Sequence, residues 1–354
     1  MIELDGSFGE GGGQILRTAL SMSVITQKAF RLKDIRKNRC NPGLAQQHLT
    51  CINAMQRLCN AHVENAEIGS QEINFYPRAL KPQTLSIDIG TAGSITLLLQ
   101  SLFPACILSG GKFRLKITGG TDVRWSMPYD YMANVLLPQL RKYADIESNL
   151  LKRGFYPKGD GKVDIRIKSK YSYDDMEGTF PFDLTESGKI LFIKGVSAAS
   201  KDLEKAEVAE RQSKSAKQLL NKLNCPIQIT NEYQDTLSAG SAITLWAIFS
   251  KKKDSDETDF IQPVILGADS LGERGKRAED VGIEAAKNLL NEIEHKAPID
   301  EHLGDNLIPF LAIFKGDIRV TKLSKHLTTN IYTVEKFLGK TFDIDEKNKI
   351  ISVK

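Results

Sequence analysis

Three short segments of the chain resemble one another, and this internal repeat constrains the fold more than any other feature. They are Phe30-Arg-Leu-Lys-Asp-Ile35, Phe113-Arg-Leu-Lys-Ile-Thr118 and Asp317-Ile-Arg-Val-Thr-Lys322. Each is strand-like and follows an apolar run of helical length, at residues 14–25, 95–108 and 303–314. A second helical pattern begins after each segment, near Gly43, Tyr129 and His326. The repeat therefore predicts three copies of one unit, with the element order βαβαββ.

The spacing of the three segments is unequal. The first two begin 83 residues apart, at 30 and 113, but the third begins 204 residues after the second, at 317, an excess of 121 residues. That excess is the size of a small domain. We expect an inserted small α/β domain at residues 187–298, in the third unit, and a main body of residues 1–186 and 299–354. An irregular extension of the main body is the alternative.

The pattern inside the predicted insert differs from that of the repeats. Helices are expected over residues 203–223 and 277–294, an apolar strand region over 236–250, and a charged loop over 251–258. Strands that alternate with helices along the whole chain predict an α/β or α+β layered architecture.

Composition excludes several classes of protein. The chain has 354 residues, of which 41% are hydrophobic and 26% charged, as in globular domains. The longest apolar run, 95–108, is shorter than the roughly 20 residues of a membrane span. The first residues, Met-Ile-Glu-Leu-Asp, do not resemble a secretory signal, so we expect a cytoplasmic protein without a membrane partner. A net charge of +4 is too small to indicate a nucleic-acid partner.

The five cysteines form no Cys-x-x-Cys pair. This spacing does not favour a zinc site, and we expect buried or idle thiols.

A glycine-rich turn, Gly9-Glu-Gly-Gly-Gly-Gln14, precedes the first apolar run. Glycines permit close backbone approach, and the N-terminus of the following helix suits a phosphate. Gln14 and Arg17 share a face of the first helical turn, so Arg17 would lie beside such an anion, while Glu10 would hold a cation. A tight turn with a solvated Arg17 is the alternative.

Arg36 and Arg39 lie just before the second helix of the first unit, which carries Gln47 and His48. Two guanidinium groups at a helix start resemble a phosphate grip. His48 falls in the apolar stripe of its helix, which favours a histidine at the edge of the core over a catalytic one, and Cys40 is expected to pack there.

The last repeat contains two further polar clusters. Glu301 and Asp305 are four residues apart, so they can converge on a ligand, although acidic residues also stabilise the first turn of any helix. His326 and Asn330 lie beside an apolar helical stripe, where a partly sheltered histidine suits a nucleophile or a general base. A helix cap or a surface residue is the alternative for His326.

These motifs together resemble those of the RNA 3'-terminal phosphate cyclase family over nearly the whole chain. The resemblance rests on these segments in order: Asp5 to Arg17, Ile35-Arg36 through Arg39, Asn41 to Leu44, Gln47 to Thr50, Gly90 to Ser94 with Gln100, Gly119 to Asp122, Gly154 to Pro157, and His326 to Asn330. It implies three repeats similar to the carboxyl-terminal domain of a bacterial translation initiation factor, plus a small inserted α/β domain.

The resemblance also implies the reaction. His326 attacks the α-phosphorus of ATP and becomes adenylylated, AMP passes to an RNA 3'-phosphate, and the neighbouring 2'-hydroxyl then closes a 2',3'-cyclic phosphate. Such an enzyme requires ATP and a divalent cation, Mg²⁺ or Mn²⁺, and acts on RNA with a 3'-phosphate end. A homodimer is compatible with the sequence.

Roles for individual residues follow from the same resemblance. It implies catalysis by His326, Arg17 and Arg39 and a metal ligand in Glu10. Residues expected around the nucleotide are Gln100, Pro128, Glu301, Asp305 and Asn330, and those expected around the substrate phosphate are Gln14, Arg36, Gln47 and His48.

The chain departs from the family pattern at two places. His302 stands where relatives carry a tyrosine, and Trp125-Ser-Met-Pro128 replaces a proline pair, so we expect adenine stacking to differ in detail. Two other readings remain. One is a non-catalytic relative that acts in ribosome assembly, which lacks the histidine and several of the charged residues found here. The other is an enolpyruvyl transferase, whose repeats are similar but which does not account for the His326 motif.

Overall fold

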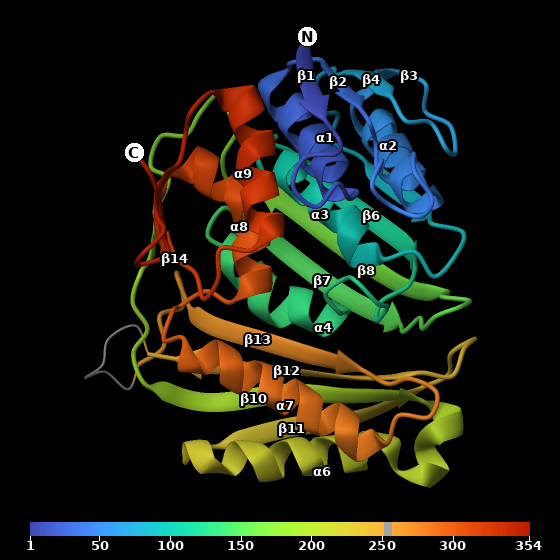
Figure 1. The fold of residues 1–354 in the computed structure, drawn as a ribbon, viewed down its shortest axis with the longest axis vertical. Helices are drawn as coiled ribbons and strands as arrows, with labels where there is room; N and C mark the ends of the chain where they lie inside the picture. Colours follow the sequence, from blue (N-terminus) through green and yellow to red (C-terminus); the bar gives the residue numbers. More distant parts are fainter. Residues whose placement is uncertain (251–256) are drawn as a thin grey trace.

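The computed structural model describes residues 1–250 and 257–354. The first unit contains, in chain order, β1 (Ile2–Asp5), α1 (Gln14–Thr26), β2 (Phe30–Lys33), α2 (Gln46–Cys59), β3 (His62–Glu64) and β4 (Ile73–Tyr76). Its sheet has the order β1-β2-β4-β3, in which β1 and β2 are parallel and the other pairs antiparallel (Figure 1).

The second unit repeats this topology with longer strands. It contains β5 (Thr84–Asp88), α3 (Ile95–Ile107), β6 (Lys112–Gly119), α4 (Tyr129–Tyr131), η1 (Met132–Leu136), α5 (Leu137–Leu140), β7 (Ala144–Lys152) and β8 (Gly161–Ser169). The sheet order is β5-β6-β8-β7, again with only its first pair parallel. The second helix of the unit contains a π-helical turn, η1, between its α-helical ends.

The third unit is interrupted after its first strand. It contains β9 (Phe182–Leu184) and then, beyond the interruption, α8 (Glu301–Phe314), β14 (Gly316–Arg319), α9 (Lys325–Leu338), β15 (Asp343–Asp345) and β16 (Ile350–Val353). The sheet order is β15-β16-β14-β9, with β9 and β14 parallel. The predicted three βαβαββ units are therefore confirmed.

The segment between β9 and α8 forms its own layer of sheet and helices. It contains β10 (Ile190–Ser200), η2 (Lys201–Ala206), α6 (Val208–Leu220), η3 (Asn221–Leu223), β11 (Ile227–Gln234), β12 (Ser241–Phe249), β13 (Val264–Leu271) and α7 (Ala278–Glu294). Its sheet has the order β11-β10-β12-β13, and Figure 1 shows it below the main body. An inserted α/β domain in the third unit is confirmed, while its exact limits at 187 and 298 stay a prediction.

Two details of the insert differ from expectation. The predicted helix over 203–223 is α-helical only as α6, because 3₁₀ turns flank it at both ends. The strand predicted over 236–250 begins later, as β12. Residues 251–256 of the predicted charged loop lie outside the described residues.

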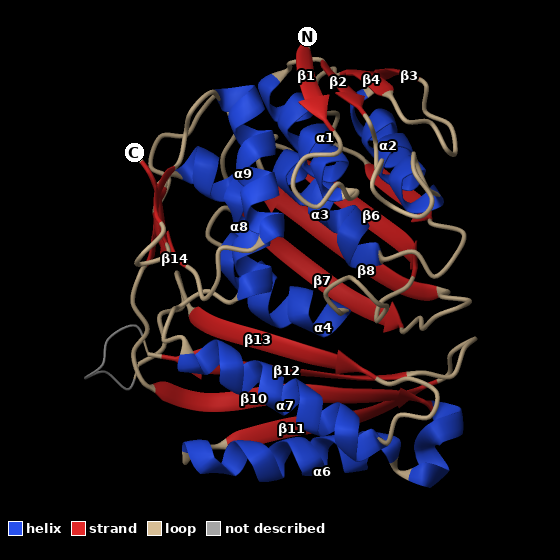
Figure 2. Ribbon diagram, in the orientation of Figure 1, coloured by secondary structure: helices blue, strands red, loops and turns tan. Residues whose placement is uncertain are grey.

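The core of the main body lies among the helices of the three units. Helix α1 packs against α3 and α9, and α8 packs against α9. Figure 2 shows these helices gathered in the middle, with the sheets around them. The apolar runs that predicted these helices are buried there, for example Ile15, Leu98 and Leu307 at 0% exposure. Packing of this kind brings residues near 10, 100 and 326 together.

Among residues 1–250 and 257–354, we find no helix with both the length and the apolar character required to cross a membrane. The thiols follow expectation in part: Cys51, Cys59 and Cys106 are buried, and Cys225 is half-buried. Cys40 is exposed, so the expectation that it packs beside the second helix is wrong. It lies in a loop that ends before α2 begins, and no helix covers it.

Candidate active site

The glycine-rich turn brings three side chains close to the backbone before α1. A Cβ atom on Gly13 would lie 2.0 Å from Nε2 of His48, and one on Gly9 would lie 2.3 Å from Oγ1 of Thr329. A Cβ on Gly12 would be 3.2 Å from a guanidinium nitrogen of Arg39. Gly9 also has a φ of 62°, which only glycine adopts without strain. Gly9 and Gly13 are therefore required, because side chains of α2 and α9 converge on this turn.

His326 lies at the centre of this convergence, in the first turn of α9. Its Nδ1 contacts Oε1 of Gln14, and its Nε2 is 3.0 Å from a carboxylate oxygen of Glu10. The side chain is 45% exposed, so a substrate can reach it. The sequence analysis identified both partners in the glycine-rich motif, but it did not predict that they contact a histidine more than 300 residues away.

The protonation state of His326 reflects two opposed effects. Burial lowers its pKa, the Glu10 carboxylate acts in the opposite direction, and Arg17 lowers it further; the net direction is down. The contact with Glu10 favours a proton on the ring, whereas burial and Arg17 oppose it. With Gln14 accepting from Nδ1–H, a neutral ring has its lone pair on Nε2.

Arg17 is buried against α3 and is only 8% exposed. Its Nε donates to Oε1 of Gln100 over 2.9 Å. Burial lowers the pKa of this guanidinium, and Glu10 partly offsets that effect. The alternative of a solvated Arg17 is therefore excluded, and a fixed positive charge lies beneath the glycine-rich turn.

His48 supplies a neutral group beside that charge. Its Nδ1 accepts from the backbone N–H of Ala45 at 3.0 Å, which leaves the proton on Nε2, the atom facing Gly13. Burial, Arg17 and Arg36 lower the pKa of His48 to about 3. His48 therefore lies at the edge of the core, as expected, with its Nε2 facing the glycine-rich turn, and its role toward a phosphate stays a prediction.

Arg36 and Gln47 fix the loops around His48. Arg36 has a left-handed backbone with a φ of 53° and donates to the carbonyl oxygen of Gly43 over 2.9 Å. Gln47 donates to the carbonyl oxygen of Ser94 over 3.1 Å, and so connects α2 to the start of α3.

Arg39 and Glu10 form the open side of the site. A guanidinium nitrogen of Arg39 is 3.6 Å from the Glu10 carboxylate, and the two side chains are 46% and 30% exposed. In the described part of the chain, no group of three or more His, Cys, Asp or Glu side chains is placed to hold a metal ion. Mg²⁺ commonly binds through one or two carboxylates plus substrate phosphates, so Glu10 alone fits such a site when phosphates are present.

The acidic residues of α8 differ from one another in environment. Glu301 forms an ion pair with Lys322, with both carboxylate oxygens 3.0 Å from Nζ. Asp305 is 5% exposed, accepts from Oγ of Ser324 over 2.6 Å, and burial raises its pKa to about 7. The buried carboxyl group of Asp305 therefore lies against the N-terminus of α9, with a pKa raised by burial.

Asn330 lies deeper than expected. It is 1% exposed, its amide donates to the backbone carbonyl of Asp305 over 2.7 Å, and its oxygen accepts from Oγ1 of Thr18 over 2.6 Å. The side chain therefore connects α1, α8 and α9. Pro128 lies immediately before α4, in the loop that leaves β6.

Sequence reasoning missed several residues that shape the site. Ser324 caps α9 by accepting from the backbone N–H of Leu327, and it also bonds Asp305. A serine just ahead of an apolar helical run is a signal that could have found it. Thr18 and Thr329 carry no such signal, because Thr18 bonds Asn330 and Thr329 lies against Gly9, each in another unit.

The assembled site offers a partly exposed imidazole at its centre, a buried and an exposed guanidinium, a neutral N–H donor from His48 and an accessible carboxylate. Such a set can bind a phosphate group and place a nitrogen nucleophile against its phosphorus.

Comparisons with known proteins all point to one family. A family model described as RNA 3'-terminal phosphate cyclase matches residues 8–344. A protein of that name from Pyrococcus furiosus is 46% identical over 345 residues, which cover 97% of this chain and 95% of the relative. Relatives of the same name from Pyrococcus abyssi and Saccharolobus solfataricus are 45% and 46% identical and cover 98% of the chain each.

Proposed function

Because the chain belongs to the RNA 3'-terminal phosphate cyclase family, we propose that it converts the 3'-phosphate at an RNA end into a 2',3'-cyclic phosphate at the expense of ATP. The observation that carries this proposal is the placement of His326 between Gln14 and Glu10, beside two arginines. A binding protein would not require a reachable imidazole among phosphate-binding groups.

The first proposed step is transfer of AMP to the enzyme. The lone pair on Nε2 of His326 forms a bond to the α-phosphorus of ATP, and the bond to the β-phosphate oxygen breaks, so pyrophosphate leaves. Gln14 holds the ring by accepting from Nδ1–H, so Nε2 is the nitrogen available for the attack. Arg39 and Arg17 stabilise negative charge on the phosphates.

Two further transfers complete the reaction. An oxygen of the RNA 3'-phosphate attacks the phosphorus of the bound AMP, and the bond to His326 breaks. The 2'-hydroxyl oxygen then attacks the 3'-phosphorus, its proton is lost, and AMP leaves. This oxygen is already close to the activated phosphorus, so proximity supplies much of the rate.

A divalent cation fits beside the Glu10 carboxylate. When bound, it would supply positive charge to the phosphate oxygens. The residues proposed to surround the nucleotide are Gln100, Pro128, Glu301, Asp305 and Asn330. Of these, Gln100 positions Arg17, and Asn330 acts through the packing of α8 and α9.

The first test is covalent labelling. Wild-type protein incubated with α-labelled ATP and Mg²⁺ in the absence of RNA should retain label on His326. His326→Ala should retain none, whereas His62→Ala should label normally, because His62 lies on β3 with a 64% exposed side chain. Label on a folded His326→Ala variant would refute the assignment.

The second test uses three RNA ends. We expect cyclic ends only from the strand with a 3'-phosphate, because a 3'-hydroxyl has no phosphate to accept AMP. A 2'-deoxy strand with a 3'-phosphate should accept AMP and stall, because it lacks the 2'-hydroxyl that closes the ring. No reaction of any 3'-phosphate strand with folded protein would favour a binding role instead.

A further inference from the structure

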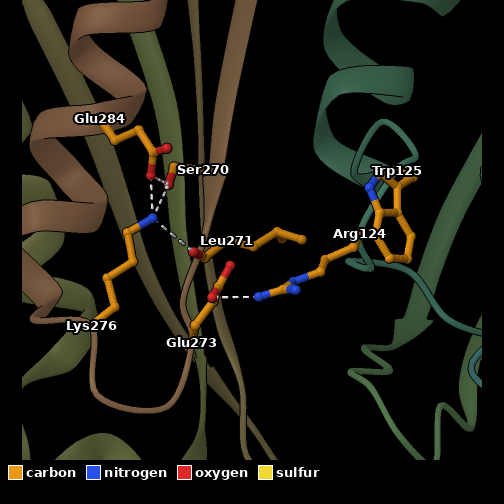
Figure 3. A pocket seen from close by; sticks show the side chains of 7 residues that line it. All are labelled: Arg124, Trp125, Ser270, Leu271, Glu273, Lys276 and Glu284. Atoms are coloured by element: carbon orange, nitrogen blue, oxygen red, sulfur yellow. Dashed lines mark hydrogen bonds and ion pairs between the residues drawn. The ribbon is translucent and has the colours of Figure 1, made fainter.

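Trp125 projects from the main body with 91% of its surface exposed. It lies in the loop between β6 and α4 and lines a pocket of about 350 Å³ together with Arg124 and residues of the insert (Figure 3). The chain has one other tryptophan, Trp246 in β12, and its exposure is only 7%. An aromatic ring of this size gains nothing from packing when it is so exposed.

The backbone at Trp125 is held in an unfavourable conformation. Its φ is 61°, in the left-handed region that bulky side chains rarely adopt. The neighbouring residues fix it: Ser126 donates to the carbonyl oxygen of Val123 over 3.0 Å, and the carbonyl of Met127 accepts from Thr96 over 2.7 Å. Strain that the surroundings maintain is common at ligand-binding positions.

The same loop is attached to the candidate active site. Thr96 lies in the first turn of α3, the helix whose Gln100 binds Arg17. Gln47 of the substrate-phosphate group donates to the carbonyl of Ser94, which caps that helix. Trp125 is therefore carried on a loop fixed to the scaffold of the site.

The charges of the pocket are already matched. Arg124 forms an ion pair with Glu273, and Lys276 forms one with Glu284, which also accepts from Ser270 over 2.6 Å (Figure 3). Since both cations are neutralised, the pocket is a poor grip for a phosphate. It offers instead an open aromatic face with a polar rim, and such a face suits the ring of a nucleobase.

We infer that Trp125 is a stacking platform for a nucleobase of the RNA substrate, upstream of its 3'-phosphate end. This inference rests on the proposed function, because it requires an RNA strand that enters the site. The ring would add affinity without selecting sequence, since every base has a face that stacks.

The test uses tryptophan fluorescence, because Trp125 and Trp246 differ so strongly in exposure. Titration of the full-length protein with a 3'-phosphorylated RNA of ten nucleotides, without ATP, should quench the emission. Trp125→Phe should lose that response, because buried Trp246 is the tryptophan that remains. Quenching by ATP alone but not by RNA would overturn the inference, as would quenching that persists in Trp125→Phe.

Kinetics provide the second measurement. Trp125→Ala should raise the KM for this RNA roughly tenfold with little change in kcat, as expected for the loss of one stacked base. Phe260→Ala is the matched control, because Phe260 is equally exposed at 91% but lies in the insert, away from the pocket residues. Equal effects of the two variants, or an unchanged KM in Trp125→Ala, would refute the inference.

Base removal locates the contact. Abasic substitution at successive positions of the RNA should raise the KM of the wild type at one position, and the same substitution should have no further effect in Trp125→Ala. Labelling with AMP in the absence of RNA separates two failures. Labelled protein without quenching refutes the role of Trp125 alone, whereas protein that does not label refutes the proposed mechanism.

Discussion

The backbone at Gly12 and Gly13 shows how tightly single residues define the site. A Cβ on Gly13 would overlap the ring of His48, which is buried and cannot withdraw, and it would also approach Arg17. A Cβ on Gly12 would meet the far end of Arg39, which is exposed and flexible. A side chain is therefore tolerated less well at position 13 than at position 12.

We predict that Gly13→Ala reduces the rate of AMP transfer at least tenfold, because it displaces both His48 and Arg17, which we propose to face the phosphates. Gly12→Ala should reduce it much less, since the Arg39 side chain can shift by a few tenths of an ångström. The measurement is single-turnover labelling with ATP at matched protein stability. Equal losses in the two variants would contradict this account of the turn.

His48 should contribute a pH-dependent term to stability. Its folded pKa of about 3 lies below the ordinary value of 6.5, so its contribution is fully present above pH 6.5 and is lost as pH falls toward 3. Urea unfolding of the wild type should therefore show a steeper acid slope than His48→Gln, by up to about 1.4 kcal/mol per pH unit. Parallel slopes would mean that His48 is protonated as easily in the folded as in the unfolded chain.

The two arginines should separate activity from stability. Both variants, Arg17→Ala and Arg39→Ala, should lose most activity, because each removes a proposed charge-assisted contact with a phosphate, worth roughly 1.5 to 3 kcal/mol. Arg17→Ala should also unfold at lower urea, because it leaves a space in the packed interior beside Gln100. Arg39→Ala, with its half-exposed side chain, should unfold like the wild type.

At the scale of elements, Asn330 connects three helices. Its amide satisfies the hydroxyl of Thr18 on α1 and the carbonyl of Asp305 on α8. Both of these groups are buried, and an unsatisfied buried polar group costs about 1 to 3 kcal/mol. The site depends on this contact because α1 carries Gln14 and α9 carries His326.

We therefore predict that Asn330→Ala lowers the free energy of unfolding by about 2 to 4 kcal/mol. Asn306→Ala is the control, because Asn306 bonds only the carbonyl of His302 within its own helix and at the surface. Urea unfolding measures both. A loss in Asn330→Ala no larger than in the control would show that the three helices do not depend on this amide.

Local patterns predicted the elements well and their contacts poorly. The apolar runs and glycine-rich turns located α1, α3 and α8 to within a few residues, because each helix buries one continuous face. The contacts of Arg17 with Gln100 and of His326 with Glu10 join residues far apart in the chain. Only the packing of three units against one another produces them, and no spacing within one unit encodes it.

At the scale of the whole molecule, a buried charge cluster joins the main body to the insert. Arg153 is 1% exposed and lies after β7. Its guanidinium is 3.3 Å from Asp122 and 2.8 Å from Asp130 of the second unit, and 3.0 Å from Glu232 on β11 of the insert. Its backbone N–H also donates to Gln234 over 2.9 Å.

The cluster contains one cation and three carboxylates, so Arg153 alone compensates their negative charge within it. Burial raises the pKa of Asp130 to about 6, Arg153 opposes that effect, and Asp122 adds to it. The free energy that Asp130 contributes should therefore fall as pH rises from about 4 to 6, because the folded chain holds a proton that the unfolded chain releases.

Removal of Arg153 should consequently destabilise the joint between body and insert. We predict that Arg153→Met lowers the free energy of unfolding by about 3 to 5 kcal/mol at pH 7, the usual cost of leaving buried carboxylates without their partner. The loss should shrink toward pH 5, because the carboxylates can then take up protons. Glu232→Gln is the control: its side chain is 36% exposed, and the change leaves Arg153 paired with two carboxylates. The measurement is urea unfolding at pH 5 and pH 7. If Arg153→Met lowers the free energy of unfolding equally at both pH values, then shape complementarity, and not charge, holds the insert against the body.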